Sequence, residues 1–342
     1  MDGEGICAGE YMVETKGITD DMSNNILILS CGTRDLLVRY FKRADYERVI
    51  GADCSELAPA LYEADKYYLI PRMKEEGYFD AILEICRKEG ITAILPLQED
   101  ELNLISENRE LFEQEGIRTI VSPVETLQIC RDKYCFFEHM TEHGIPVLNS
   151  YIDLDKFEKA YEAGKIGFPV FVKPVRGAGS VGVMKVSCME LLKALFAYSE
   201  EPLLIQEFCN GREFGIDVYV DLVSGEVVDI FAKEKLRMRA GETEKSVTSN
   251  DPALKEFVYR AASTLKLSGP VDMDVFEKDG IFYLSEINPR FGGGFPHAYA
   301  CGVDTPSYIL QNLQGIANES HLQEKREEIY VLKYSDILCI DR

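Results

Sequence analysis

Histidine is scarce in this chain, with four residues among 342, which is too few for a histidine-rich metal site. The ten cysteines include no CxxC pair and follow no regular spacing. Together with the lack of a signal-peptide pattern, this cysteine usage predicts reduced thiols in a cytoplasmic protein.

Long apolar runs and excess positive charge are also missing. No apolar run approaches the ~20 residues that a helix needs to span a bilayer. The 37 basic and 59 acidic residues give a formal net charge of −22. This charge argues against nucleic acid or an anionic membrane as a partner, but leaves room for a local basic pocket that binds phosphates. The composition, 46% hydrophobic and 28% charged, is that of an ordinary globular protein, and the length predicts two or three domains.

Strand-like and helix-like segments alternate from residue 25 to residue 124. Residues 1–24 show no sustained period, and we interpret them as a disordered tail or an upstream start-site artefact. The alternation predicts a parallel sheet with helices on both faces. The expected strands cover 26–30, 48–52, 93–96 and 119–122, and the expected helices cover 33–43, 78–89 and 100–115.

A dinucleotide site is one interpretation of that sheet. Asp53, at the end of the second expected strand, stands where such sites place an acid for the ribose. The first turn, however, has the single glycine Gly32 where the dinucleotide fingerprint has three. NAD binding is therefore the weaker interpretation.

The pattern changes near residue 125. A helix is predicted over 125–148, closing at Gly144, and mostly antiparallel strands with few helices follow it. The expected strands cover 168–174, 183–186, 203–208 and 213–221, with a helix at 189–198. This change predicts a second domain of α+β type.

The segment 281–290 is the most informative stretch of the sequence. Glu286 and Asn288 are two residues apart on an apolar strand, so both side chains point to the same face. Hard oxygen ligands on one face suit Mg²⁺, which takes few protein ligands and completes its shell with water and phosphate. Arg290 follows at once, with a permanently charged fork shaped for phosphate.

A polar turn at 278–280 joins this segment to an upstream strand at 271–276 and predicts a hairpin. Asp274 then faces Glu286 across the strands and supplies a third oxygen. The alternative is a solvated sheet edge with ordinary surface carboxylates, which is the usual outcome for any single acid. That alternative weakens because three oxygens, an arginine and the glycine-rich segment 291–294 fall close together.

A glycine-rich loop adds a second kind of feature. Gly177, Gly179 and Gly182 lie between two expected strands, and glycines let successive backbone amides approach an anion. The loop lacks the Lys-Ser/Thr ending and the following helix of a Walker A site, so alone it is a weak sign of phosphate binding. Lys173 strengthens the sign, because an ammonium on an apolar strand rarely lacks an anionic partner.

One motif points to different chemistry. Residues 139–143 fit the H-x-x-E-H pattern of some zinc peptidases, and both histidines would share a helix face. Gly144 follows directly and is typical of a C-cap, so His143 would lie in the last turn, where a cation is favoured. No second helix with a third ligand is evident in the sequence, so zinc is the weaker interpretation.

Taken together, the motifs resemble those of ATP-grasp enzymes. In chain order they are Lys133, Lys173, the loop 176–182, the segments 206–208 and 211–213, Asp274 and 286–290. The resemblance covers residues 25–315. It is closest to single-module ligases similar to half of the carbamoyl-phosphate synthase large subunit, and the amino-acid ligase of pyrrolysine biosynthesis is similar. It implies a Rossmann-like preATP-grasp domain at 25–124, an ATP-grasp fold of two α+β subdomains at 125–320, and a C-terminal tail with strands at 321–342.

The resemblance implies a nucleotide site for ATP. Lys133 and Lys173 would contact the phosphates, with Lys173 also near the adenine. Glu207 and Phe208 would meet the adenine through backbone groups, and Glu213 would hold the ribose hydroxyls. The loop residues that would close over the β- and γ-phosphates are Gly177, Ala178, Gly179, Ser180 and Gly182. This chain has Ala178 where some relatives carry a further glycine, which is a mild departure from the family pattern.

The resemblance also implies a metal and substrate side. The residues that would hold one or two Mg²⁺ ions, with Mn²⁺ as an alternative, are Asp274, Glu286 and Asn288. Arg290, as a catalytic residue together with Lys173, would face the transferred phosphoryl group. The regions that would border the substrate are 99–102, Lys235, Arg239, 241–245, 292–297 and 301–304.

The implied reaction is an ATP-dependent ligation. A substrate carboxylate attacks the γ-phosphate, ADP leaves, and an amine then displaces phosphate from the acylphosphate to give an amide. The partners would be a small carboxylate and an amine, which the sequence does not name, and a homodimer is an open option. Two alternatives are a phosphotransferase that releases a stable phosphorylated product and a non-catalytic ATP-binding regulatory protein.

Overall fold

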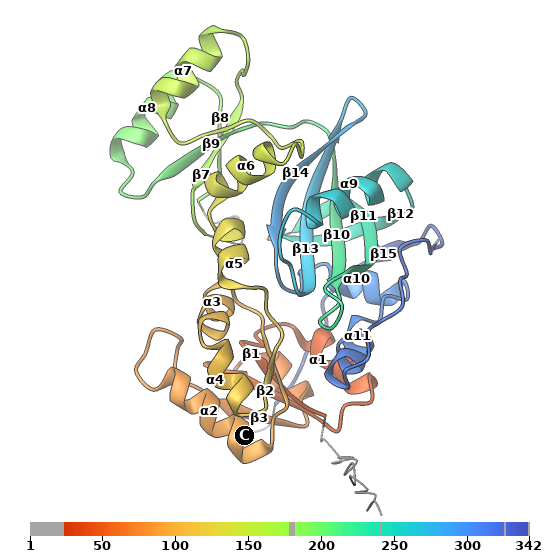
Figure 1. Ribbon diagram of the computed structural model, residues 1–342. Coiled ribbons are helices and arrows are strands. Elements are labelled where there is room, and N and C mark those ends of the chain that lie inside the picture. Colours follow the sequence, from red (N-terminus) through yellow and green to blue (C-terminus); the bar gives the residue numbers. More distant parts are fainter. Residues whose placement is uncertain (1–23, 178–181, 240, 325, 341–342) are drawn as a thin grey trace, which may run out of the picture.

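The structure is a computed structural model that describes residues 24–177, 182–239, 241–324 and 326–340. These residues form three sheets, each with its own helices (Figure 1). Residues 1–23 of the expected leader lie outside the described residues, as do Ala178, Gly179 and Ser180 of the expected phosphate loop.

The first sheet is parallel, with the strand order β3-β2-β1-β4-β5, so the expected parallel architecture is confirmed. Residues 26–29 of its central strand are fully buried, because helices cover both faces of such a sheet and make its strands continuously apolar. Its strands are β1 (Asn25–Leu29), β2 (Arg48–Asp53), β3 (Lys66–Leu69), β4 (Ala93–Pro96) and β5 (Arg118–Thr119), and its helices are α1 (Asp35–Arg43), the 3₁₀ helix η1 (Pro59–Glu63), α2 (Tyr78–Glu89), α3 (Glu99–Glu107) and α4 (Arg109–Gln114). The single helix expected at 100–115 is two helices, α3 and α4, separated at Asn108.

The Asp53 carboxylate stabilises the turn after β1 through hydrogen bonds. It accepts the backbone amide of Gly32 at 2.8 Å and that of Ser55 at 2.9 Å. The acid that imitates a ribose ligand in the sequence therefore binds the protein's own backbone.

The second sheet is small and antiparallel, with the order β6-β9-β7-β8. Its strands are β6 (Ser150–Tyr151), β7 (Val170–Pro174), β8 (Met184–Val186) and β9 (Leu203–Glu207), and its helices are α7 (Leu154–Glu162) and α8 (Met189–Tyr198). The helices lie together at the outer end of the molecule (Figure 1), where Phe157 and Leu192 pack on the sheet through Val170, Val186 and Ile205.

The third sheet is antiparallel, with the order β14-β13-β10-β11-β12-β15. Its strands are β10 (Arg212–Val220), β11 (Val227–Arg239), β12 (Glu242–Ser249), β13 (Gly269–Lys278), β14 (Ile281–Asn288) and β15 (Tyr330–Leu332), and its helices are α9 (Pro252–Ala262), α10 (Phe295–Ala300) and α11 (Thr305–Leu313). The division of the chain at residues 125 and 321 stays a prediction.

The prediction of one helix over 125–148 is wrong, and the difference matters for the site. Two helices, α5 (Val124–Arg131) and α6 (Lys133–Glu142), replace it. Asp132 between them has an extended backbone and accepts the amides of Tyr134 and Cys135 with its carboxylate, both at 3.1 Å. An aspartate in this position is a strong N-cap, so it starts a new helix with Lys133 as the first residue.

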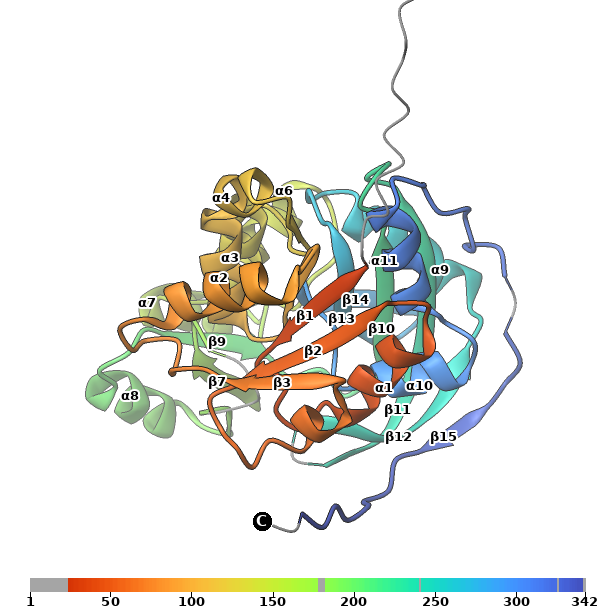
Figure 2. The same cartoon turned by 90° about the horizontal axis from the view of Figure 1, so that it is seen from below.

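The first and third sheets are joined by aromatic packing between α1 and the segment around α10. Tyr40 meets Phe295 with ring centroids 6.2 Å apart, and Phe41 meets Phe291 at 6.0 Å. Figure 2 shows β1, β2 and β3 side by side, with α1 and α10 close to one another. This contact fixes the first turn of the N-terminal sheet against the end of the third sheet.

Gly211, directly before β10, offers a test of the pairing between β10 and β13. A Cβ atom at Gly211 would lie 2.0 Å from the Glu277 carbonyl oxygen of the neighbouring strand. Overpacking of this kind costs about 1–3 kcal/mol or more, so Gly211→Ala should lower the urea midpoint clearly. Gly167→Ala is the control, because a Cβ there meets no atom within 4 Å. Equal midpoints for the two variants would contradict the close approach of β10 and β13.

None of the helices in the described residues is long and apolar enough to cross a membrane.

Candidate active site

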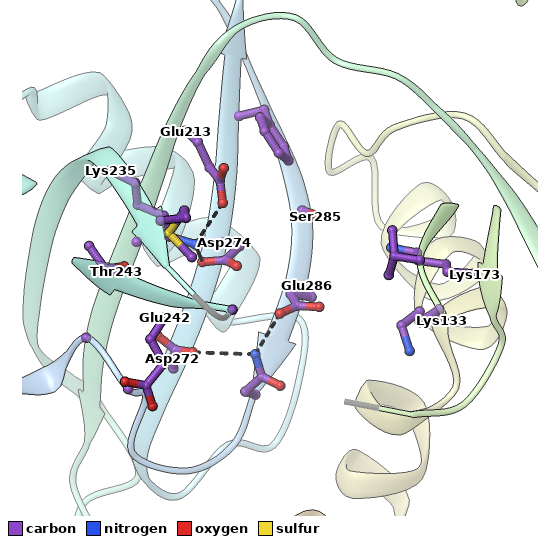
Figure 3. A pocket seen from close by; sticks show the side chains of 18 of the residues that line it. Lys133, Lys173, Glu213, Lys235, Glu242, Thr243, Asp272, Asp274, Ser285 and Glu286 are labelled. Atoms are coloured by element: carbon purple, nitrogen blue, oxygen red, sulfur yellow. Dashed lines mark hydrogen bonds and ion pairs between the residues drawn. The ribbon is translucent and has the colours of Figure 1, made fainter. Parts of the chain in front are cut away.

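A cavity of about 430 Å³ lies between the second and third sheets, within the range of roughly 300–1,000 Å³ typical of small-molecule sites. In Figure 3, Lys133 and Lys173 stand on one side and face Glu286 and Asp274 on the other. The predicted site residues that line it are Lys133, Lys173, Gly177, Glu207, Glu213, Asp274, Glu286, Asn288 and Arg290. Phe208 and Gly182 do not line it.

The expected hairpin is confirmed. Asp274 of β13 is the register partner of Glu286 on β14, and Asp272 is the partner of Asn288. The turn has positive φ at both Asp279 (53°) and Gly280 (76°). A two-residue turn of this kind matches the twist of the flanking strands, and it places both carboxylates on one face.

Asp274 is already neutralised within the protein. The Lys235 ammonium contacts its carboxylate at 2.5 Å and that of Glu213 at 2.8 Å. Burial raises the pKa of Asp274 to about 7, with the Lys235 charge opposing the rise. Burial alone would lower the pKa of Lys235, but the two carboxylates outweigh it and raise that pKa above its ordinary value.

The donor set has the size that magnesium requires. Among the described residues, no group of three or more His, Cys, Asp or Glu side chains is placed to hold a metal ion. The face instead offers two opposed carboxylates, with the Asn288 amide bonded to Glu286 at 3.1 Å. Mg²⁺ is usually held by one or two carboxylates plus substrate phosphates, so the residues fit this ion when a nucleotide supplies the other oxygens.

The two lysines across the cavity have no carboxylate partner among the residues that the structure describes. Lys173 of β7 donates to the Gln206 side-chain oxygen at 2.8 Å, and Lys133 donates to the Gly177 carbonyl at 2.6 Å. Burial lowers the pKa of Lys173 to about 8 and also lowers the pKa of Lys133. Both ammonium groups are therefore desolvated cations beside a cavity, which favours an anionic ligand.

The segment expected to meet the adenine is held by backbone and side-chain contacts. The Glu207 amide donates to the Asn149 carbonyl at 2.8 Å, and its carboxylate accepts the Asn149 amide at 2.7 Å. The Phe208 ring does not line the cavity; it meets the Phe171 ring and the Lys185 ammonium, which lies 3.9 Å from its centroid. This agrees with a role for Phe208 through its backbone alone, which stays a prediction.

Gly182 lies at the far end of the expected phosphate loop. It has a φ of 73°, and a Cβ atom there would meet the Pro174 ring at 3.1 Å. A glycine is therefore needed for the local fold, whatever the loop binds.

The substrate end of the cavity includes residues that sequence reasoning missed. Lys233 of β11 is 1% exposed and pairs with Asp217, and its partner across the sheet is Gly215. A Cβ at Gly215 would meet the Lys235 side chain at 3.0 Å, so this glycine gives the two lysines room. The spacing of Lys233 and Lys235 on an apolar strand could have revealed the pair. Arg34, from the first sheet, also lines the cavity.

Only part of the other regions expected to border the substrate lies at the cavity. The residues of those regions that line it are Glu99, Lys235, Gly241, Glu242, Thr243, Gly293 and Gly294. Glu101 is instead buried and accepts the hydroxyls of Ser30 and Tyr78. Arg239 pairs with Glu244 at 3.4 Å outside the cavity lining, and residues 301–304 do not line it either.

The H-x-x-E-H histidines are engaged within the protein. A ring nitrogen of His139 lies 3.1 Å from the Thr264 carbonyl oxygen, and one of His143 lies 2.8 Å from the carbonyl oxygen of His139. The two rings stack with centroids 4.2 Å apart. These contacts give both histidines a structural role at the end of α6.

Known proteins resemble the chain at both ends. Residues 26–120 match the model of the PylC-like N-terminal domain, and residues 199–337 match the model described as ATP-grasp in the biosynthetic pathway with Ter operon. The carbamoyl phosphate synthase large chain of Methanothrix thermoacetophila is 24% identical over 79% of this chain. A D-alanine--D-alanine ligase of Geobacillus thermodenitrificans is 29% identical over 54% of it.

A solved structure shares the fold. The biotin carboxylase domain of the Hydrogenobacter thermophilus 2-oxoglutarate carboxylase, in complex with MgADP, ADP and bicarbonate, has a TM-score of 0.69 at 20% identity, covering 88% of this chain and 72% of that one. The fold is of the ATP-grasp type. Residues 199–337 resemble an ATP-grasp family, and residues 26–120 resemble the N-terminal domain of PylC-like proteins. The chain spans 26% of the carbamoyl phosphate synthase chain and 58% of the D-alanine--D-alanine ligase.

Proposed function

We propose that the protein is an ATP- and Mg²⁺-dependent ligase that activates a small carboxylate as an acylphosphate and joins it to an amine, releasing ADP and phosphate. The observation that carries this proposal is the opposition of two unlike faces across one cavity. Among the described residues, Lys133 and Lys173 donate to neutral oxygens on one side, and Asp274 is the register partner of Glu286 on the other. A nucleotide triphosphate with its metal between them satisfies both faces.

Phosphoryl transfer depends mainly on positioning and on neutralising charge. Asp274, Glu286 and Asn288 would hold Mg²⁺, which would neutralise charge on the nucleotide phosphates. Lys133 and Lys173 hold the phosphates from the opposite side. Arg290, whose guanidinium donates to the Asn288 side chain and the Phe291 carbonyl, stabilises charge on the transferring group. No protein nucleophile is required, because the acylphosphate forms on the substrate.

The comparisons support the class of reaction and leave the substrates open. The curated relatives are named as a synthase and a ligase, and the solved relative holds MgADP. We also propose a cytoplasmic setting, which the nine free cysteines among the described residues support. A homodimer is part of the proposal only as an analogy to the solved biotin carboxylase domain, whose structure is described as a dimer.

The test is a search for acid-dependent ADP formation. The protein is incubated with ATP and Mg²⁺, with pairs of amino acids, small carboxylates and amines. Nucleotide chromatography should show ADP, mass spectrometry should show a condensed product, and hydroxylamine should trap the acylphosphate as a hydroxamate. AMP as the product, or a stable phosphorylated product indifferent to every amine, would overturn the proposal. ATP binding without turnover for any pair would favour a regulatory protein.

A further inference from the structure

The N-terminal sheet contributes a cation to the cavity. Arg34 lies in the turn between β1 and α1, yet it lines the same cavity as Lys233 and Arg290. It also lines a smaller cavity of about 40 Å³ that shares Glu242 and Gly293 with the first. The aromatic packing of α1 on α10 holds this turn in place.

The Arg34 guanidinium has no hydrogen bond or ion pair with any residue that the structure describes. It interacts electrostatically, without direct contact, with the charges of Glu242, Arg290 and Asp272. Glu242 is engaged by the Lys333 ammonium, and Asp272 accepts from the Asn288 amide at 3.5 Å. Burial lowers the pKa of Arg34, and the neighbouring Arg290 lowers it further.

Arg39, on the following helix, shows the contrast. It pairs with Glu63 at 2.8 Å and with Asp35 at 3.6 Å. In a chain with 59 acidic and 37 basic residues, a half-buried arginine without a carboxylate partner is unexpected. A desolvated guanidinium next to a second one is costly unless an anion joins them.

The proposed nucleotide does not meet this need. Lys133, Lys173 and Arg290 are the cations assigned to the phosphates, and Arg34 comes from a different domain. The two acids near Arg34 would repel a doubly charged phosphate more strongly than a singly charged carboxylate. The planar fork of arginine matches a carboxylate through two parallel hydrogen bonds.

We propose that Arg34 binds a carboxylate of the substrate that does not react and stays free in the product. The inference rests on the proposed ligase function and deepens it, because it assigns a second anionic group to the substrate. Arg34 is then a specificity-determining residue supplied by the N-terminal domain.

The experiment is a calorimetric titration of the full chain, saturated with MgADP, with the common amino acids and the straight-chain dicarboxylates from malonate to adipate. The acid that binds best to the wild type should bind about 10- to 100-fold more weakly to Arg34→Gln, the loss typical of one charge-assisted contact. Arg34→Lys should recover part of the loss. Arg39→Gln removes the same charge from a surface ion pair and should change nothing.

A second measurement changes the ligand. The wild type should bind the same acid at least 10-fold better than its analogue with that carboxylate converted to an amide, and Arg34→Gln should not distinguish the two. MgATP affinity should be equal in the wild type and Arg34→Gln, which separates this contact from the phosphate site.

Equal acid binding by Arg34→Gln and the wild type would overturn the proposal, as would a panel in which no acid binds the wild type. If the acid binds through Arg34 but no pair of acid and amine releases ADP, the proposed ligase function fails and the role of Arg34 stands.

Discussion

Glu286→Gln should reduce ADP formation by about 100-fold or more, the range seen when one group that stabilises transition-state charge is removed. Glutamine keeps the shape of the side chain but removes half of the carboxylate pair formed with Asp274 across the hairpin. The measurement is the initial rate of ADP release at a fixed low concentration of Mg²⁺.

The fold should tolerate this change. Among the described residues, the Glu286 carboxylate accepts one hydrogen bond, from the Asn288 side-chain amide, which a glutamine oxygen can also accept. The Glu286 charge adds to the burial that raises the pKa of Asp274, so its removal also relieves a repulsion. The melting temperature without nucleotide should therefore stay within a few degrees of the wild type.

Glu277→Gln is the matched control, because Glu277 lies on the same strand as Asp274 but pairs with Arg212 outside the cavity lining. Its activity should equal that of the wild type. Normal turnover of Glu286→Gln at low Mg²⁺ would move the metal site away from the hairpin.

The hairpin shows what the sequence could predict. Alternating apolar residues and the polar turn at 278–280 determine the facing of Asp274 and Glu286, because the side-chain period of a strand is two and the turn sets the register. The parallel sheet was predictable for a similar reason, since its buried strands alternate with helical segments. Both features depend on residues that are close together in the sequence.

The parts that the sequence did not reveal depend on distant residues. Lys235 reaches Asp274 from β11, across β10, at a position where Gly215 leaves room. Arg34 reaches the cavity only because α1 docks on α10. No local pattern encodes either contact, because each needs the order of strands or the packing of two domains.

The sequence did not predict the helix break at Asp132, for a different reason. Residues 125–142 are helical on both sides of it, so the period continues and hides the interruption. Its sign is an aspartate that can cap the next amides, which is also acceptable on an exposed helix face. The break makes Lys133 the first residue of α6, where its amide donates to the Val175 carbonyl at 3.1 Å.

Lys173→Met should weaken ATP binding by roughly 1.5–3 kcal/mol, the range of a charge-assisted contact. Methionine keeps most of the bulk of the lysine, which is 9% exposed, and removes its charge. Calorimetric titration with Mg-ATP measures the loss. Lys193→Met is the control, because Lys193 of α8 pairs with Glu158 of α7, and the ATP affinity of this variant should equal that of the wild type.

The pH dependence makes the assignment of Lys173 stricter. Burial holds the pKa of Lys173 at about 8 in the free protein, and bound phosphates would raise it. The contribution to binding is then complete below pH 8 and declines as the pH rises above it, by up to about tenfold per unit for one proton. Wild-type affinity should follow this decline, whereas Lys173→Met should bind weakly and almost equally at pH 7 and pH 9. A variant with wild-type affinity, or with the same decline above pH 8, would show that Lys173 does not contact the phosphates.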